Sequence, residues 1–358
     1  MFRLLTWVLI VVAACLSLLL LSLRYWVLPD IEQYRENIAS AISEASGQYI
    51  TIGEISADWD GLRPHMMLSV VKVHDAEGDI TLLLHRLEGT VSWRSILHGK
   101  LIFREIAIEQ PDLIVRRDAG GGIHVAGFAL SKELTGTDHG FSDWLLNQRR
   151  VTINNASILW QDDQRGAAEL ELLVNLRLEN RGSRHRFGMH AIPPAELAAR
   201  LDLRGDFTGE SLNNSDAWRG RLFMQIDHAD IAAWHVWLPF PPEIKLNRGI
   251  GALRLWSAID GADMTKLTAD VSLHNVETQL APNLPELNLG RLQGRVGWKK
   301  INAGETEGDE FFAQKLRTSV PGKQKRELPP VNFLLQLIPP HGEKSGGGKL
   351  IIDNSKLE

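Results

Sequence analysis

The residue types best suited to chemistry in this chain are its histidines, its paired carboxylates and a glycine-rich stretch near the C-terminus. The stretch "EKSGGGKL" around Gly347 resembles a phosphate-binding loop, but Glu343 and Leu350 stand where that loop needs glycine and Ser or Thr. Asp162 and Asp163 belong to the turn sequence "DDQRG", where aspartate serves backbone geometry. The 12 histidines have no cysteine or second carboxylate at metal-ligand spacing. We therefore predict no catalytic residue, no metal site and no cofactor, and a protein that is not an enzyme.

The composition narrows the class of protein further. Its 39 Lys and Arg residues against 44 Asp and Glu residues give a formal net charge of -5, which argues against nucleic acid as a partner. Cys15 is the only cysteine in the sequence, so an intrachain disulfide and a cysteine-rich zinc site are impossible. With 358 residues and a hydrophobic fraction of 44%, the fold must be held by apolar burial and strand pairing.

A long apolar segment opens the chain. Residues Leu4–Leu23 carry no charge, and a helix of this length spans about 30 Å, the thickness of the hydrocarbon core of a bilayer. Arg3 precedes the segment, and Tyr25 and Trp26 follow it, where aromatic rings favour the membrane interface. The sequence predicts an uncleaved single-pass anchor over residues 1–27, with a cytoplasmic N-terminus and the bulk of the chain translocated.

Two processing signals compete with this anchor. A cleaved signal peptide has a shorter apolar region, of about 7–15 residues, and small residues at the cleavage site. The sequence "VAAC" (Val12–Cys15) resembles a lipoprotein cleavage site, but the apolar run continues well beyond Cys15. The length of the run favours the spanning helix.

The rest of the chain alternates between apolar and polar residues. After a helix predicted between Asp30 and Gly47, residues Ala168–Asn180 ("AELELLVNLRLEN") show the pattern most clearly, with Leu173 as the one apolar residue on the polar side. Successive side chains of a strand point to opposite faces, so each such run predicts a strand with one apolar face. The apolar positions that we single out are Ala168, Leu170, Leu172, Val174, Leu176, Leu178, Leu201, Leu203, Leu267, Val271 and Leu273.

Three architectures could use such strands. In a sandwich, the apolar faces of two sheets meet about 10 Å apart. A transmembrane β-barrel would turn the apolar faces to lipid, although a long apolar helix at the start disfavours its export. A long curved antiparallel sheet with a partly closed apolar face would give acyl chains a sheltered path. The alternation by itself does not distinguish the sandwich from the curved sheet, and both remain possible.

Four motifs in the first third of the chain resemble one known family. They are "IGEISADWDGLRP" from Ile52, "V.V.D..G" from Val71, "SWRSILHGKL" from Ser92 and "PDLIVRRD..G" from Pro111. Together with the anchor they resemble the AsmA-like family of Gram-negative bacteria, in its YhdP branch. The resemblance covers residues 1 to about 130, and the strand-rich remainder through Trp298 is compatible with it.

The resemblance implies a fold, a location and a function. AsmA-like proteins are held in the inner membrane by one helix and place a β-rich, taco-shaped groove in the periplasm, where they are implicated in moving phospholipid towards the outer membrane. For this chain it implies a mainly β fold whose open groove is lined by the apolar positions above, conducts phospholipid passively and supports outer-membrane integrity. The partners implied are phospholipid acyl chains, the inner membrane, and outer-membrane or periplasmic proteins.

The expected organisation follows the changes in pattern along the chain. It comprises an anchor over 1–27, an AsmA-like N-terminal part over 28–130, a continuing β-groove over 131–300, a flexible insertion over 301–330 and a further strand segment over 331–358. Because the chain stops at Glu358 soon after "KLIID", which is typical of the start of a strand, and family members are considerably longer, we expect a truncated chain or a tail that departs from a longer parent. A second function stays open: a periplasmic scaffold or assembly factor for outer-membrane biogenesis that binds proteins by strand pairing.

Overall fold

The computed structural model describes most of the chain as two compact units. The described residues are 2–74, 78, 80–93, 95, 102–125, 128–129, 144–210, 215–234, 236–237, 245–261, 263–279, 282–283, 285–303, 306–319, 330–338 and 347–353. The first unit comprises Met1–Leu113, Ala126–Ala129 and Glu133–Ala156, and the second comprises Ile114–Val125, Leu130–Lys132 and Ser157–Glu358.

The first unit begins with the expected apolar helix. Helix α1 (Phe2–Ser22) continues as a π-helical turn, η1 (Leu23–Val27), and residues Leu5–Val27 are long and apolar enough to cross a membrane. The guanidinium of Arg24 lies over the ring of Trp59 at 5.9 Å, a favourable cation–π distance. This contact joins the end of the apolar helix to the first strands.

A short helical segment then packs on strand β1 (Tyr49–Asp60). It comprises the 3-10 turn η2 (Ile31–Tyr34) and helix α2 (Arg35–Ser46). Gly47 ends α2 at φ 72°, a left-handed conformation that glycine adopts without strain, as the sequence predicts. A hydrogen bond of 2.9 Å from the Arg35 guanidinium to the carbonyl oxygen of Gly53 ties the segment to β1.

Four antiparallel strands form the sheet of the first unit. They are β1, β2 (Arg63–His74), β3 (Ile80–Val91) and β4 (Phe103–Glu109), each paired with the next. The first residues of β8 (Arg150–Asp162) then pair with β4 in parallel, an exception in a sheet expected to be antiparallel. It arises because further strands intervene in sequence between β4 and β8: β5 (Asp112–Arg117), β6 (Ile123–Val125) and β7 (Phe128–Ala129).

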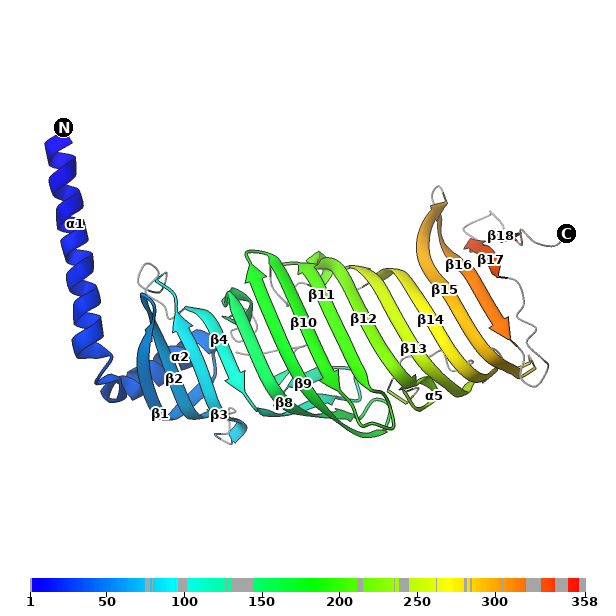
Figure 1. Cartoon of the computed structure of the whole chain (residues 1–358), viewed down its shortest axis with the longest axis horizontal. Coiled ribbons are helices and arrows are strands. Elements are labelled where there is room, and N and C mark those ends of the chain that lie inside the picture. Colours follow the sequence, from blue (N-terminus) through cyan, green and yellow to red (C-terminus); the bar gives the residue numbers. More distant parts are fainter. Residues whose placement is uncertain are drawn as a thin grey trace. The chain divides into compact units, whose positions relative to one another are not determined.

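The second unit is dominated by a meander of long strands, seen side by side in green to orange in Figure 1. From β9 to β18 each strand pairs antiparallel with the next. The strands are β9 (Ala167–Arg181), β10 (Arg184–Ile192), β11 (Arg200–Thr208), β12 (Arg219–Asp230), β13 (Lys245–Asp260), β14 (Asp263–Gln279), β15 (Leu287–Ala303), β16 (Thr306–Ser319), β17 (Val331–Ile338) and β18 (Gly347–Asp353). A 3-10 turn, η3 (Ser215–Ala217), precedes β12, and helix α5 (Ile231–Trp234) follows it.

These pairings confirm the predicted fold class: a mainly β chain with an N-terminal apolar helix and a long, curved, open sheet. Among the described residues, β18 pairs with β17 and not with β9, so the meander of the second unit does not close. Strand β16 lies inside the range 301–330, for which the sequence predicts a flexible insertion, and residues 304–305 and 320–329 of that range lie outside the described residues.

Bulges at left-handed residues bend the long strands. His228 (φ 51°) in β12 and Lys315 (φ 52°) in β16 each lie where the register with the neighbouring strand shifts. An extra residue in one strand kinks it and increases its twist. Opposite the second bulge stands Gly294, where a Cβ atom would lie 2.9 Å from the Cα of Leu316. The backbones approach so closely there that only glycine fits without a shift.

Candidate functional site: the apolar face of the second unit

One apolar row crosses every strand from β9 to β18. Strand pairing places one residue of each strand next to its partner in this central row. At about 4.8 Å between neighbouring strands, the row extends for about 43 Å. Its members are Leu176, Met189, Leu203, Met224, Leu255, Ala269, Val296, Ala313, Phe333 and Ile352.

A row on either side of the central row widens this apolar face. The row nearer to helix α5 contains Val174, Ala191, Leu201, Ile226, Leu253, Val271 and Gly294. The row on the other side contains Leu178, Phe187, Gly205, Leu222, Ser257, Leu267, Trp298, Phe311, Leu335 and Leu350. Ser257 is the one polar side chain in the three rows, so the face is apolar almost without interruption from β9 to β18.

The larger side chains of the central row are only partly covered. Leu176, Leu203 and Leu255 are half-buried, and Ile352 on the last strand is 62% exposed. The core of a sandwich would bury such residues completely, because a second sheet would pack on them. The partial exposure therefore favours an open apolar surface over a closed core in this part of the unit.

Helix α5 and the turn before β11 cover one end of the apolar face. The indole Nε1 of Trp234 donates to the carbonyl oxygen of Leu197 at 3.1 Å, and that of Trp237 donates to the carbonyl oxygen of Ala168 at 3.1 Å. The two indole rings meet edge to face, 6.1 Å apart. Around them lies a buried cluster that comprises Leu170, Leu197, Ala198, Ile226, Ala229, Ile231, Trp234, Leu273 and Val276.

The positions singled out in the sequence lie on this one face in two different settings. Those at the covered end belong to the buried cluster or pack against it: Leu170, Leu172, Leu201, Val271 and Leu273. Val174 is also buried, and Ala168 is exposed. Those on the open part are half-buried: Leu176, Leu178, Leu203 and Leu267. Whether the open part holds lipid stays a prediction.

Several residues of the central row were missed by the sequence analysis. Met189 and Met224 lie in strands whose alternation is interrupted by other polar and aromatic residues, and Phe333 follows the proline-rich stretch before β17. The available signal was the same period of two that marks β9. It could assign each residue to a face of its own strand, but it could not align one strand with the next.

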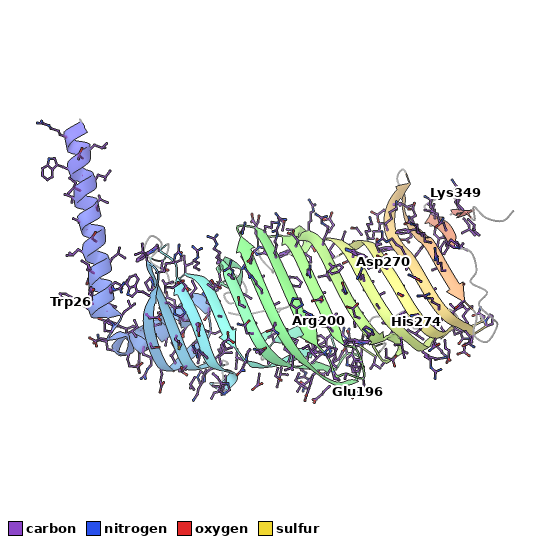
Figure 2. All side chains as sticks on the ribbon, viewed as in Figure 1. Trp26, Glu196, Arg200, Asp270, His274 and Lys349 are labelled. Carbon is purple, nitrogen blue, oxygen red and sulfur yellow. The ribbon has the colours of Figure 1, made fainter. Side chains whose placement is uncertain are left out.

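The opposite face of the sheet is polar and carries ion pairs between neighbouring strands. The guanidinium of Arg184 donates two hydrogen bonds, of 2.8 and 2.6 Å, to the carboxylate of Asp206. The guanidinium of Arg295 donates two, of 2.6 and 2.8 Å, to the carboxylate of Asp270. These hydrogen bonds hold the pKa of both aspartates below its usual value, because they favour the charged carboxylate. Figure 2 shows Asp270 and His274, which share this face of β14.

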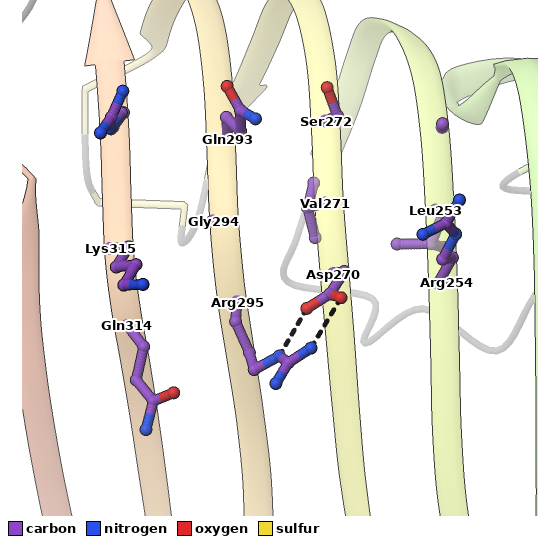
Figure 3. A pocket seen from close by; sticks show the side chains of 12 residues that line it. Leu253, Arg254, Asp270, Val271, Ser272, Gln293, Gly294, Arg295, Gln314 and Lys315 are labelled. Atoms are coloured by element: carbon purple, nitrogen blue, oxygen red, sulfur yellow. Dashed lines mark hydrogen bonds and ion pairs between the residues drawn. The ribbon is translucent and has the colours of Figure 1, made fainter.

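A cavity of about 700 Å³ opens across strands β13 to β16. Figure 3 shows Arg295 and Asp270 paired at its centre, with Arg254 and Lys315 on the flanking strands. Arg254, Asp270 and Arg295 are consecutive partners in the pairing and are sequence neighbours of central-row residues. The charged side chains of the cavity therefore lie on the polar face, on the other side of the sheet from the central row, and Leu253, Val271 and Gly294 of the adjacent apolar row complete the lining.

His185 is a buried titratable group at the end of the apolar face opposite helix α5. It is 5% exposed, its Nδ1 lies 2.7 Å from Oδ1 of Asn180, and its Nε2 lies 3.1 Å from the carbonyl oxygen of Gly209. The ring of Trp218 packs on it with centroids 5.1 Å apart. Burial lowers the pKa of His185, since the charged imidazolium loses its hydration.

We expect the stability of the protein to fall between pH 7 and pH 5 because of His185. Its pKa is depressed in the folded state, so below about pH 6.5 the unfolded chain binds a proton that the folded chain does not, which costs at most about 1.4 kcal/mol per pH unit. Melting temperatures across this range should fall less steeply for His185→Gln. The exposed His274→Gln variant should follow the wild type, and a His185→Gln curve as steep as the wild type would contradict this role.

Comparison with known proteins identifies the family. The family model described as "YhdP protein" matches residues 1–335. The chain is also 26% identical over 271 residues to the intermembrane phospholipid transporter YhdP of Escherichia coli (strain K12), an alignment that covers 72% of this chain and 19% of that protein. This chain therefore spans about a fifth of the length of that relative. The long match to the family model, together with the apolar helix and the open sheet, places the chain in the YhdP family of AsmA-like proteins.

Proposed function

We propose that the apolar face of the second unit binds the acyl chains of phospholipid and lets them slide along it. The observation that carries this proposal is the central row, which is apolar on every strand from β9 to β18 and only partly covered. The function named for the Escherichia coli relative, intermembrane phospholipid transport, supports the choice of phospholipid as ligand.

Transfer along such a face needs no chemical step by the protein. Each CH₂ group removed from water contributes about 0.8 kcal/mol, so acyl chains lie on the apolar rows while their headgroups stay in water. Because neighbouring strands present similar side chains, the binding energy changes little as a chain moves from one strand to the next. We propose passive conduction along the rows in the direction of the outer membrane, in support of its integrity.

The proposed location is the bacterial inner membrane, with α1 as the single span, the N-terminus in the cytoplasm and the two β units in the periplasm. In a Cys15→Ser background, a cysteine introduced at the exposed position Glu196 should react with a membrane-impermeant maleimide in cells whose outer membrane alone is permeabilised. If the cysteine is labelled only after the inner membrane is lysed, the β units lie in the cytoplasm and the proposed orientation is wrong.

Mass spectrometry of lipids extracted from the purified full-length protein tests the proposed ligand. We expect phospholipid to co-purify through extensive washing in detergent. The alternative function, a periplasmic scaffold that binds proteins by strand pairing, rests on the exposed strand β18, whose Leu350 and Ile352 are 59% and 62% exposed. A folded protein that carries no lipid but retains protein partners would favour the scaffold.

A further inference from the structure

The cavity on the polar face is cationic in a chain that is acidic as a whole. Four cationic side chains line it (Arg254, Arg295, Lys315 and Arg317) against one carboxylate, that of Asp270, which gives a local charge of +3. The whole chain has a net charge of -5. The cavity is therefore positively charged although the chain as a whole is negatively charged. A surface does not need such a concentration of one sign of charge in order to be solvated.

Most of this positive charge is not neutralised by the protein. Arg295 is paired with Asp270, and the charge of Arg254 also helps to lower the pKa of that carboxyl group. Arg254, Lys315 and Arg317 form no ion pair with a carboxylate anywhere in the described part of the chain, and all three side chains are exposed to solvent. Lys315 and Arg317 lie together on β16, and Arg254 lies three strands away on β13, so an anion bound in the cavity would be attracted by positive charge from both sides.

The backbone around the cavity is shaped by the bulge in β16. The backbone of Lys315 adopts a left-handed conformation, and its backbone N–H donates to Oδ1 of Asn332 on β17 at 2.7 Å. Gly294 allows Leu316 to approach closely, and two residues of β16 consequently stand opposite one residue of β15. The bulge thereby places Gln314 opposite Arg295 and Arg317 opposite Gln293 on the same face although they are three residues apart, which regular alternation would not do, and Lys315 at the bulge also lines the cavity.

We propose that this cavity is a binding site for a phosphate-bearing anion. Arginine presents a planar fork of donors that matches phosphate oxygens, and a lysine beside it supplies a further point charge. The volume falls in the range of small-ligand sites, and the cationic side chains among the polar and apolar residues of the lining favour an anionic ligand over an acyl chain. The ligand is distinct from lipid bound on the central row, because the sheet lies between the two surfaces.

Titration calorimetry of the full-length protein in neutral detergent tests this site, with pyrophosphate as a soluble probe and sn-glycerol 3-phosphate as a fragment of a lipid headgroup. We expect saturable binding of at least one probe, with Kd below about 1 mM at low salt. Tighter binding of pyrophosphate would indicate a free phosphate ligand, and tighter binding of glycerol phosphate a headgroup. Absence of binding by both probes would overturn the proposal.

Two matched double variants separate the site from general electrostatics. Arg254→Gln/Arg317→Gln removes two charges from the cavity, and Arg204→Gln/Arg221→Gln removes two charges from the same face on strands β11 and β12. The first should weaken binding at least tenfold, and the second less than twofold. An equal loss in both, or no loss in the first, would show that no defined site exists. Lipid co-purification should be unchanged in both variants, so this test and that of the proposed function can fail independently.

Discussion

A Leu176→Glu/Leu203→Glu double variant should fold but lose at least nine-tenths of its co-purifying phospholipid. Both side chains lie in the open part of the central row, on β9 and β11, and are half-buried without belonging to the buried cluster. Carboxylates there can reach water in the free protein, whereas an acyl chain laid over them would have to desolvate two charges, at several kcal/mol. A loss of only 1.4 kcal/mol already lowers affinity about tenfold.

The same strand offers a matched control for this experiment. Leu173 lies on the opposite face of β9 and is 54% exposed, so Leu173→Glu adds one such carboxylate to this strand without touching the apolar rows. Lipid content, normalised to protein and measured by mass spectrometry, should match the wild type for this variant. Circular dichroism confirms that all three proteins are folded. If the double variant is folded and keeps its lipid, the central row is not the lipid-binding surface.

Trp234→Ala should lower the free energy of unfolding of the second unit by about 3–5 kcal/mol, the usual cost of removing a buried tryptophan. The indole is 6% exposed, lies within the buried cluster and donates its N–H to Leu197. Its removal would leave a cavity between α5 and the apolar face and would also remove one of the two hydrogen bonds to the Leu197 carbonyl oxygen, the other coming from the N–H of Asp230 at 2.9 Å. Urea denaturation followed by circular dichroism measures the change.

Trp256 provides the comparison for this second experiment. It is 38% exposed on the polar face and contacts the ring of Phe223, 5.4 Å away, and the guanidinium of Arg295, 5.6 Å away. Trp256→Ala removes the same side chain but leaves no enclosed cavity, so we expect a loss of about 1 kcal/mol. Equal losses in the two variants would mean that the cluster around α5 does not hold this end of the sheet together.

Much of this architecture is local and could be predicted from the sequence. Alternation of polar and apolar residues assigns the faces of a strand without reference to any other strand, and for β9 it placed Leu176 and Leu173 on opposite sides as found. The apolar helix α1 and the glycine that ends α2 are also set by nearby residues. The AsmA-like motifs of the first third led to the right family, which the match over residues 1–335 confirms.

What the sequence alone determined is therefore which side chains share a face within each strand, where the apolar helix lies and which family the chain belongs to. The tertiary structure decided which strands align and at what register, because pairing joins residues far apart in the chain and bulges such as that at Lys315 shift it without a local signal. It also decided that α5 buries Leu170 and Leu273 while Leu176 and Leu203 stay partly open, since coverage depends on segments that meet only in the folded chain.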